Sequence, residues 1–459
     1  MPESVEFDLD LIRRYDSSGP RYTSYPTAVE FSPDVGEEAY LRRLRASNAS
    51  GRPLSLYFHI PFCAHVCYYC ACNKIVTADR SRAGPYLDHL FREVRLRASQ
   101  VDPGRVVTQL HWGGGTPTFL NENQMRALMQ VTRENFTLLD DDSGEYSVEV
   151  DPREVRDYTL AVLRGIGFNR ISLGVQDFDP DVQKAVHRIQ PEDMTLRVLD
   201  DARALGFRSI NIDLMYGLPL QTEESFSTTL DKVIEARPDR LSVFNYAHLP
   251  ERFKPQRRIN AEDLPAPEVK LRILQLTIEK LTAAGYQYIG MDHFALLDDE
   301  LAVAQREGSL RRNFQGYSTH ADTDLIAMGV SAISAVANSF SQNHLSLEEY
   351  YSDLEQAQLP IRRGYELDED DIIRADVIQQ LVCHGRLDMK QLGETHGIDF
   401  GDYFASELNT LGSMEKDGLL TLGERRIDVL PRGRLLIRNL CRVFDRYRKE
   451  SENQFSKMI

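Results

Sequence analysis

Four cysteines within ten residues constrain the fold of this chain more than any other feature. They lie in the segment CAHVCYYCAC, and the first three, Cys63, Cys67 and Cys70, have the spacing Cys-x3-Cys-x2-Cys. Iron–sulfur clusters are normally held by four thiolates. Three thiolates without an obvious fourth partner predict a [4Fe–4S] cluster with one iron open to a non-protein ligand. An open coordination position is typical of catalytic metal sites.

A zinc site is the alternative interpretation of these cysteines, with Cys72 or His65 as the fourth ligand. Structural zinc sites usually pair two separated Cys-x2-Cys or His-x3-His units. The sequence has no such pair, and this favours the iron–sulfur cluster.

Composition limits the class of protein. The 459 residues are enough for a large core and more than one domain. We expect no membrane span and no signal peptide, because the sequence has no apolar run of the required kind. Cys383 and Cys441 stand alone, so we expect no disulfides and a reducing cytoplasm. The net charge of −16 argues against a nucleic-acid partner.

Short β-branched or apolar runs alternate with helical patterns through the middle of the chain. The expected strands are 54–60, 106–112, 146–150, 170–175, 209–215, 240–246 and 286–291. Repeated strand–helix–strand units predict an α/β fold with a parallel sheet. Ligands gather at the carboxyl ends of such strands.

Glycine marks the ends of three expected helices. Gly167, Gly206 and Gly285 each precede an aromatic residue and a strand, and glycine is favoured past a helix end because it accepts positive φ. A further amphipathic helix is expected to begin at 151–152, with apolar residues at helical spacing up to Ile166.

Three domains are expected from these patterns. Residues 1–50 form an extension, 51–364 carry the strand–helix repeats, and 365–459 form a mainly helical domain with a possible hairpin at 418–430.

Several motifs follow the expected strands. HWGGGTP (111–117) has three consecutive glycines, whose missing Cβ atoms would let the backbone form a wall against a ligand. Glu149, Gln176 and Asp213 fall near one edge of the sheet, where a carboxylate could bind hydroxyl or amino groups. Arg188 could pair with a carboxylate. Each could instead be a helix cap, a turn residue or a surface residue.

Taken together, these segments and others identify a resemblance to a family. CAHVCYYCACNKIV, HWGGGTPT, GVQDF, NIDLMYGLP, VFNYAHLP and RNFQGYST closely resemble the oxygen-independent coproporphyrinogen III oxidases, which are radical S-adenosylmethionine enzymes of haem synthesis. The resemblance runs nearly end to end, from PRYTSYPTA (20–28) to GRLLIRNLC (433–441).

The resemblance implies a partial TIM-like barrel with the cluster inside, an N-terminal segment and a C-terminal helical domain. We expect the N-terminal segment to close over the active site. It implies cluster ligands at Cys63, Cys67 and Cys70 and two bound S-adenosylmethionine molecules. The contacts to these molecules that it implies are Tyr57, Tyr69, Gly114, Gly115, Thr116, Glu149, Gln176, Arg188, Asp213, Ala247 and Ile333. Tyr69 stands where the family often has Phe.

The implied reaction is the oxidative decarboxylation of two propionates of coproporphyrinogen III to vinyl groups, giving protoporphyrinogen IX. A 5′-deoxyadenosyl radical, formed when the reduced cluster cleaves S-adenosylmethionine, would remove the unactivated hydrogen. The implied partners are this substrate, an electron donor and an electron acceptor, and the implied state is a monomer. Cys72 is a candidate catalytic thiol, because a thiol so near a radical could exchange a hydrogen or proton; a buried structural thiol is the alternative.

The substrate carries four carboxylates, so charge complementarity predicts a local basic surface on this acidic chain. The candidates are Arg21, Lys74, Arg252, Lys254, Arg257, Arg258, Arg311 and Arg312. A haem-binding chaperone of the same superfamily is the alternative function. That relative usually lacks the extra thiol and the N-terminal extension, both of which are present here.

Overall fold

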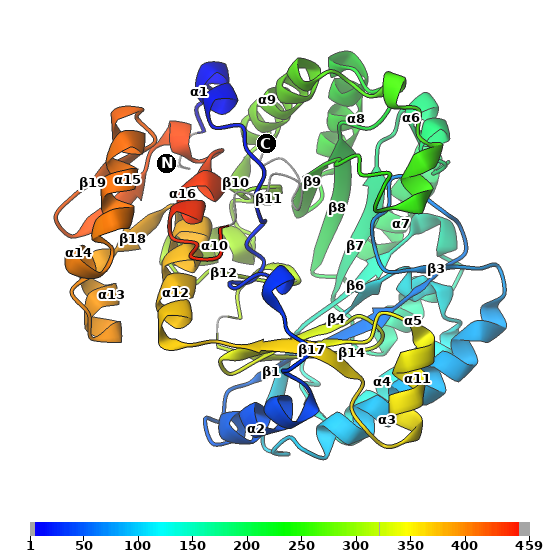
Figure 1. Ribbon diagram of the computed structural model, residues 1–459. Helices are drawn as coiled ribbons and strands as arrows, with labels where there is room; N and C mark the ends of the chain where they lie inside the picture. The colour runs from blue at the N-terminus through cyan, green and yellow to red at the C-terminus, as the bar shows by residue number, and fades with distance from the viewer. Residues whose placement is uncertain (1–4, 321, 449–459) are drawn as a thin grey trace. The chain divides into compact units, whose positions relative to one another are not determined.

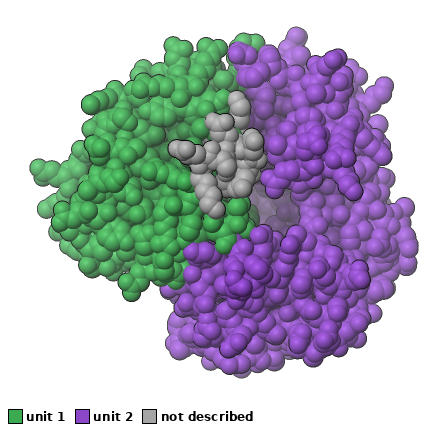
Figure 2. Space-filling view, viewed as in Figure 1, with its two compact units in different colours: residues 1–30, 271–321, 367–459 green, residues 31–270, 322–366 purple. Residues whose placement is uncertain are grey.

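The structure, a computed structural model, describes residues 5–320 and 322–448. The chain forms two compact units, each assembled from segments far apart in the sequence (Figure 2). Unit 1 comprises 1–30, 271–321 and 367–459, and unit 2 comprises 31–270 and 322–366.

Seven parallel neighbours form the central sheet of unit 2, in the order β9-β8-β7-β6-β4-β1-β14. Their bounds are β1 Leu54–Ile60, β4 Val106–Gly114, β6 Glu145–Val150, β7 Arg170–Gln176, β8 Ser209–Tyr216, β9 Arg240–Asn245 and β14 Asp324–Met328. The predicted α/β fold with a parallel sheet is confirmed. β14 was not predicted.

Most of the remaining elements of unit 2 extend or cover this sheet (Figure 1), while β2 and β3 form a separate two-stranded sheet. The strands are β2 Phe62–Cys63, β3 Ile75–Val76, β5 Thr137–Leu138, β15 Ile333–Val336, β16 Ser339–Asn343 and β17 Ile361–Glu366. The helices are α2 Glu37–Asn48, α3 Ala83–Ala98, α4 Glu122–Asn135, α5 Thr159–Gly165, α6 Pro180–Ala185, α7 Glu192–Ala204, α8 Glu223–Ala236 and α11 Leu347–Glu355. The pairs β14–β15, β15–β16 and β16–β17 are antiparallel.

Apolar and polar side chains alternate along the strands and give the sheet one apolar and one polar face. In β1, Leu54, Leu56 and Phe58 are fully buried, because successive side chains point to opposite faces and these pack against the helices. The other face carries polar side chains in register: Tyr57 lies opposite His111 of β4. Polar groups on a partly enclosed face are suited to binding a ligand.

The helix expected from 151–152 is shorter than predicted. Residues Pro152–Glu154 form only a 3₁₀ turn, Val155 is extended, and α5 begins at Thr159. The Asp151 side chain caps the turn and also binds two arginines described below, so tertiary contacts override the helical pattern here. The predicted helix-end glycines are confirmed, because Gly167, Gly206 and Gly285 all have positive φ.

Unit 1 is mainly helical, with short hairpins. Its strands are β10 Tyr286–Gly290, β11 His293–Leu296, β12 Arg311–Asn313, β13 Gly316–Ser318, β18 Arg386–Asp388, β19 Leu420–Leu422 and β20 Arg426–Val429. Its helices are α1 Leu9–Arg14, most of α9 Pro267–Ala283, α10 Glu300–Glu307, α12 Glu369–His384, α13 Met389–His396, α14 Phe400–Tyr403, α15 Ala405–Lys416 and α16 Ile437–Val443. The hairpin expected at 418–430 is present as β19 and β20.

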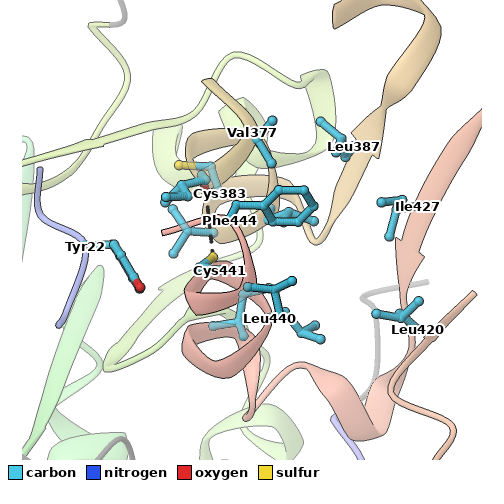
Figure 3. Close-up of a cluster of buried hydrophobic side chains, with 14 of the residues drawn as sticks. Tyr22, Val377, Cys383, Leu387, Leu420, Ile427, Leu440, Cys441 and Phe444 are labelled. Atoms are coloured by element: carbon cyan, nitrogen blue, oxygen red, sulfur yellow. Dashed lines mark hydrogen bonds between the residues drawn. The ribbon is translucent and has the colours of Figure 1, made fainter. Parts of the chain in front are cut away.

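A hydrophobic core holds unit 1 together (Figure 3). The N-terminal segment belongs to it, since Tyr22 is 1% exposed and its hydroxyl donates to Asp445 at 3.0 Å. Cys383 and Cys441 lie in the same core. In the described part of the chain, none of the helices combines the length and the apolar character that crossing a membrane requires.

Candidate active site

The cysteine-rich loop leaves the carboxyl end of β1 and is closed at its base. β2 and β3 pair in parallel, and backbone bonds join Ile75 N to Pro61 O at 2.7 Å and Thr77 N to Cys63 O at 2.9 Å. Cys67 is buried, and Cys72 is exposed. The loop is thus a defined structure at the sheet edge where ligands of parallel sheets bind.

Two of the predicted cluster sulfurs receive contacts from side chains on other elements. Thr116 Oγ1 lies 3.5 Å from Cys63 Sγ, Arg153 Nη2 lies 3.4 Å from Cys67 Sγ, and Arg188 Nη1 lies 3.5 Å from Cys67 Sγ. Donors and positive charges stabilise thiolates and tune iron–sulfur clusters. These donors therefore suit anionic sulfurs at Cys63 and Cys67.

The third sulfur is paired with the exposed thiol. A hydrogen bond from Cys72 lowers the pKa of Cys70 to about 5 against the effect of burial, and Lys74 contributes in the same direction. The same pairing raises the pKa of Cys72 well above its usual range. Lys74 Nζ donates to the Cys70 carbonyl at 2.9 Å. Cys72 therefore contacts a predicted ligand, which is compatible with either of its predicted roles.

The sequence interpretation missed a buried carboxylate that organises the two arginines. Asp151 accepts hydrogen bonds from Arg153 at 2.7 Å and from Arg188 at 3.2 Å. Burial alone would raise its pKa, but the two guanidinium charges lower the pKa to about 2. Arg188 also donates to Gly174 O at 2.6 Å. The sequence signal for this carboxylate was the run Asp151-Pro152-Arg153 after the third expected strand. The same run is equally typical of a helix N-terminus.

A second missed residue, His111, orders Glu149. His111 Nε2 lies 3.3 Å from Glu149 Oε1, and Gly114 N donates to Glu149 Oε2 at 3.1 Å. Burial opposes ionisation of Glu149, yet these donors hold its pKa below the usual value. His111 stacks on Tyr57, with ring centroids 5.8 Å apart. The Glu149 side chain remains 44% exposed, so an anionic acceptor stays available to a ligand.

Packing alone requires two of the three glycines, Gly114 and Gly115, because the neighbour of Gly113 is the flexible end of the Glu149 side chain. A Cβ would lie 2.8 Å from Glu149 Oε1 at Gly113, 2.6 Å from the His59 ring at Gly114 and 2.6 Å from Pro61 O at Gly115. Contacts this short are not tolerated by rigid neighbours. The glycines therefore let β4 approach β1 closely, whatever they contact in a bound state.

Asp213 is brought beside Glu149 by strand register. Ser172 of β7 lies opposite Glu149, and its hydroxyl donates to Asp213 at 2.8 Å. Asn211 Nδ2 donates to the other carboxylate oxygen at 2.8 Å. Burial, and secondarily the charge of Glu149, raises the pKa of Asp213 to about 6 in spite of these donors. Two predicted carboxylates from different strands thus share one face.

A buried amide, also missed, connects the cysteine loop to the end of β9. Gln256 is 1% exposed, and its Nε2 lies 3.0 Å from Tyr69 O and 3.3 Å from Ala247 O. Its Oε1 accepts from Leu249 N at 2.6 Å. Two predicted cofactor contacts, Tyr69 and Ala247, are therefore positioned by one side chain far along the sequence.

The remaining predicted residues lie on or near the same sheet. Gln176 is the last residue of β7 and has a φ of +70°. Ile333 begins β15, which is separated from β1 by β14. His65, the alternative zinc ligand, has its Nε2 3.5 Å from Glu154 Oε1. His59 Nε2 lies 2.9 Å from Asn73 O.

Comparison with known proteins adds independent findings. A model of the radical SAM superfamily matches residues 57–233. The chain is 55% identical to the oxygen-independent coproporphyrinogen III oxidase of Pseudomonas aeruginosa over 460 residues, covering 100% of both chains. It is 53% identical to the enzyme of the same name from Escherichia coli K12, covering 100% of this chain and 99% of that one. A solved structure of the Escherichia coli coproporphyrinogen III oxidase, described as a radical SAM enzyme, matches with a TM-score of 0.93 and 52% identity, covering 97% of this chain and 100% of that one.

Proposed function

The chain belongs to the family of oxygen-independent coproporphyrinogen III oxidases within the radical S-adenosylmethionine superfamily, and from this premise we propose which of its residues carry the reaction. It is an oxidoreductase of haem biosynthesis that converts two propionates of coproporphyrinogen III to vinyl groups, giving protoporphyrinogen IX. Its fold is the predicted partial barrel, and its cofactors are a [4Fe–4S] cluster and S-adenosylmethionine.

Cys63, Cys67 and Cys70 hold the cluster in this proposal. The observation that carries it is the set of donors around these sulfurs, which includes Arg153 and Arg188 at Cys67. When bound, the cluster would supply the one-electron reduction of S-adenosylmethionine that the breaking of an unactivated C–H bond requires.

Two S-adenosylmethionine molecules are bound along the polar face of the sheet. Glu149 and Asp213 offer acceptors for hydroxyl or ammonium groups, Arg188 offers a donor to a carboxylate, and Tyr57 and Tyr69 offer aromatic surfaces. The contribution of the protein is orientation and exclusion of water at this face. Gly114, Gly115, Thr116, Gln176, Ala247 and Ile333 complete the proposed contacts.

Cys72 is the proposed hydrogen or proton carrier, since its thiol contacts Cys70 and is exposed. The substrate carboxylates bind basic side chains. An electron donor and an electron acceptor are the further partners in this proposal. We propose that the enzyme acts as a monomer in the cytoplasm.

The test is anaerobic turnover of reconstituted protein with S-adenosylmethionine, a reductant and coproporphyrinogen III. We expect 5′-deoxyadenosine and the vinyl product to appear together. Deoxyadenosine without vinyl product would retain the radical chemistry and contradict the substrate. If neither product forms although the protein contains verified iron and sulfide, the proposed roles of these residues are contradicted.

A further inference from the structure

Unit 1 carries buried arginines that the radical chemistry does not use. Arg312, Arg434 and Arg438 are 5%, 9% and 7% exposed. Burying a guanidinium is costly unless it is paired. The chain as a whole has a net charge of −16, so this concentration of positive charge is not a consequence of composition.

Two neighbouring arginines already have structural partners. Arg438 Nε donates to Pro20 O at 2.9 Å, and its Nη2 donates to Gly19 O. Arg21 forms an ion pair with Asp292 at 2.6 Å. These contacts fix the N-terminal segment within unit 1, and they account for both side chains without a ligand.

Arg312 differs because two of its donors have no acceptor. Among the residues that the structure describes, its Nε and Nη1 are buried without a hydrogen-bond partner. Its backbone is held on β12 by Gln379, which accepts from Arg312 N at 3.1 Å and donates to Arg312 O at 2.6 Å. The guanidinium carbon lies 4.7 Å from the centroid of the Tyr317 ring. The donors are therefore held in place without an acceptor.

The surroundings of Arg312 are positive. Burial, then the charge of Arg21, with a smaller contribution from Arg312, lowers the pKa of Arg438 to about 10, and Asp292 only partly opposes them. Burial and then the charge of Asp292 raise the pKa of Tyr288, whereas the charges of Arg434 and Arg312 act to lower it. One carboxylate, already paired with Arg21, thus lies among several arginines. Such a setting attracts an anion.

We propose that Arg312 anchors a carboxylate-binding site in unit 1, which accepts one carboxylate through charge-assisted hydrogen bonds. Arg434 adds positive charge to this site. The inference deepens the proposed function and rests on it: coproporphyrinogen III carries four propionates, and one of them is the occupant. A small free carboxylate has the same chemistry and is the other source. Of the basic residues singled out in the sequence, Arg312 alone is identified here by unpartnered buried donors.

Binding without turnover tests the site. Reconstituted holoenzyme is titrated with coproporphyrin III, the oxidised and unreactive form of the substrate, and with its tetramethyl ester. Arg312→Met is expected to weaken binding of the tetracarboxylate at least about tenfold, because a hydrogen bond to a charged group is lost. The ester is expected to be insensitive to the substitution. Arg306→Met removes the same charge from the surface of α10 and is expected to change neither affinity by more than about twofold.

A stability measurement separates binding from a structural role. Arg312→Met is expected to keep or raise the melting temperature of the ligand-free protein, because it removes a buried charge that lacks acceptors. Arg374→Met is the contrasting control: Arg374 pairs with Asp370 and Glu407, each at 2.9 Å, so its loss is expected to lower the melting temperature. A large drop for Arg312→Met would overturn the proposal in favour of a structural role.

Sodium propionate distinguishes the two sources. If Arg312→Met weakens coproporphyrin binding, the substrate is the source. If it abolishes only a propionate-induced rise in melting temperature, a free carboxylate is the source. If Arg312→Met changes neither the affinity for coproporphyrin III nor the propionate-induced rise in melting temperature, there is no carboxylate site at Arg312. Failure of the proposed function is a separate result, because wild-type protein would then lack turnover whatever Arg312 binds.

Discussion

Five of the six cysteines fall into two contrasting environments. Cys63, Cys67 and Cys70 lie in a loop among hydroxyl, thiol and guanidinium donors, whereas Cys383 and Cys441 lie in the apolar core of unit 1 (Figure 3). Burial raises the pKa of Cys383 to about 12 and that of Cys441 further. The same side chain is therefore a potential ligand in one unit and an inert packing group in the other, and the neighbours decide which.

Removing one cysteine from each set gives the largest expected contrast. Cys67→Ala is expected to yield colourless protein without iron, sulfide or 5′-deoxyadenosine formation, because the cluster loses one of three ligands. Cys441→Ala is expected to retain cluster and activity and to lose about 1–2 kcal/mol of stability. Metal analysis and product assays measure both. Retained activity in Cys67→Ala would refute the cluster assignment.

Thiol labelling of cluster-free native protein probes the same contrast. Cys72 is exposed, whereas Cys383 and Cys441 are fully buried. The raised pKa of Cys72 slows its reaction with iodoacetamide. Cys72 is still expected to be modified faster than either core thiol, because the core must first open. Peptide mass spectrometry follows each site over time. Comparable rates would mean that the core of unit 1 is not closed.

Two buried glutamines sharpen the comparison. Gln256 binds the backbone of the cysteine loop, while Gln305 donates to Ile289 O at 2.5 Å and to Cys383 O at 2.8 Å in unit 1. Replacing either with Leu is expected to cost about 1–3 kcal/mol, because buried backbone groups lose partners. Only Gln256→Leu is expected to raise the KM for S-adenosylmethionine, by about tenfold.

Calorimetric unfolding and initial rates measure the two glutamine effects. An equal rise in KM for Gln305→Leu would show that general destabilisation, and not the position of the loop, limits cofactor binding.

The ionised carboxylate of Asp213 is expected to lower the free energy of unfolding slightly. Because the pKa of Asp213 is raised to about 6, the folded protein binds a proton between pH 4 and pH 6 that the unfolded chain does not. Asp213→Asn is therefore expected to gain about 1–2 kcal/mol above pH 6, and the gain is expected to disappear toward pH 4. Melting temperatures across this range measure the effect.

The matching functional expectation is that Asp213→Asn binds S-adenosylmethionine more weakly at neutral pH, since the charged acceptor is lost. A stability gain that persists at pH 4 would point to packing rather than ionisation as its cause.

The strands of the parallel sheet were predictable because apolar alternation and helix-end glycines are local signals. β1, for example, begins and ends where the pattern predicts, at Leu54 and Ile60. The helix at 151–166 was predicted too long because Asp151 is committed to Arg153 and Arg188, which no local pattern reveals. β14 was missed because its pairing with β1 joins residues far apart in the sequence.

The sequence by itself determined the cysteine spacing, most strands of the parallel sheet and the family of the chain, because each depends on local pattern or on motif identity. Only the tertiary structure decided that Asp151, His111 and Gln256 support the predicted residues. It also decided that the buried donors of Arg312 lack acceptors. Such contacts join residues tens to hundreds of positions apart, and their energies depend on burial and on neighbouring charge, neither of which a linear pattern contains.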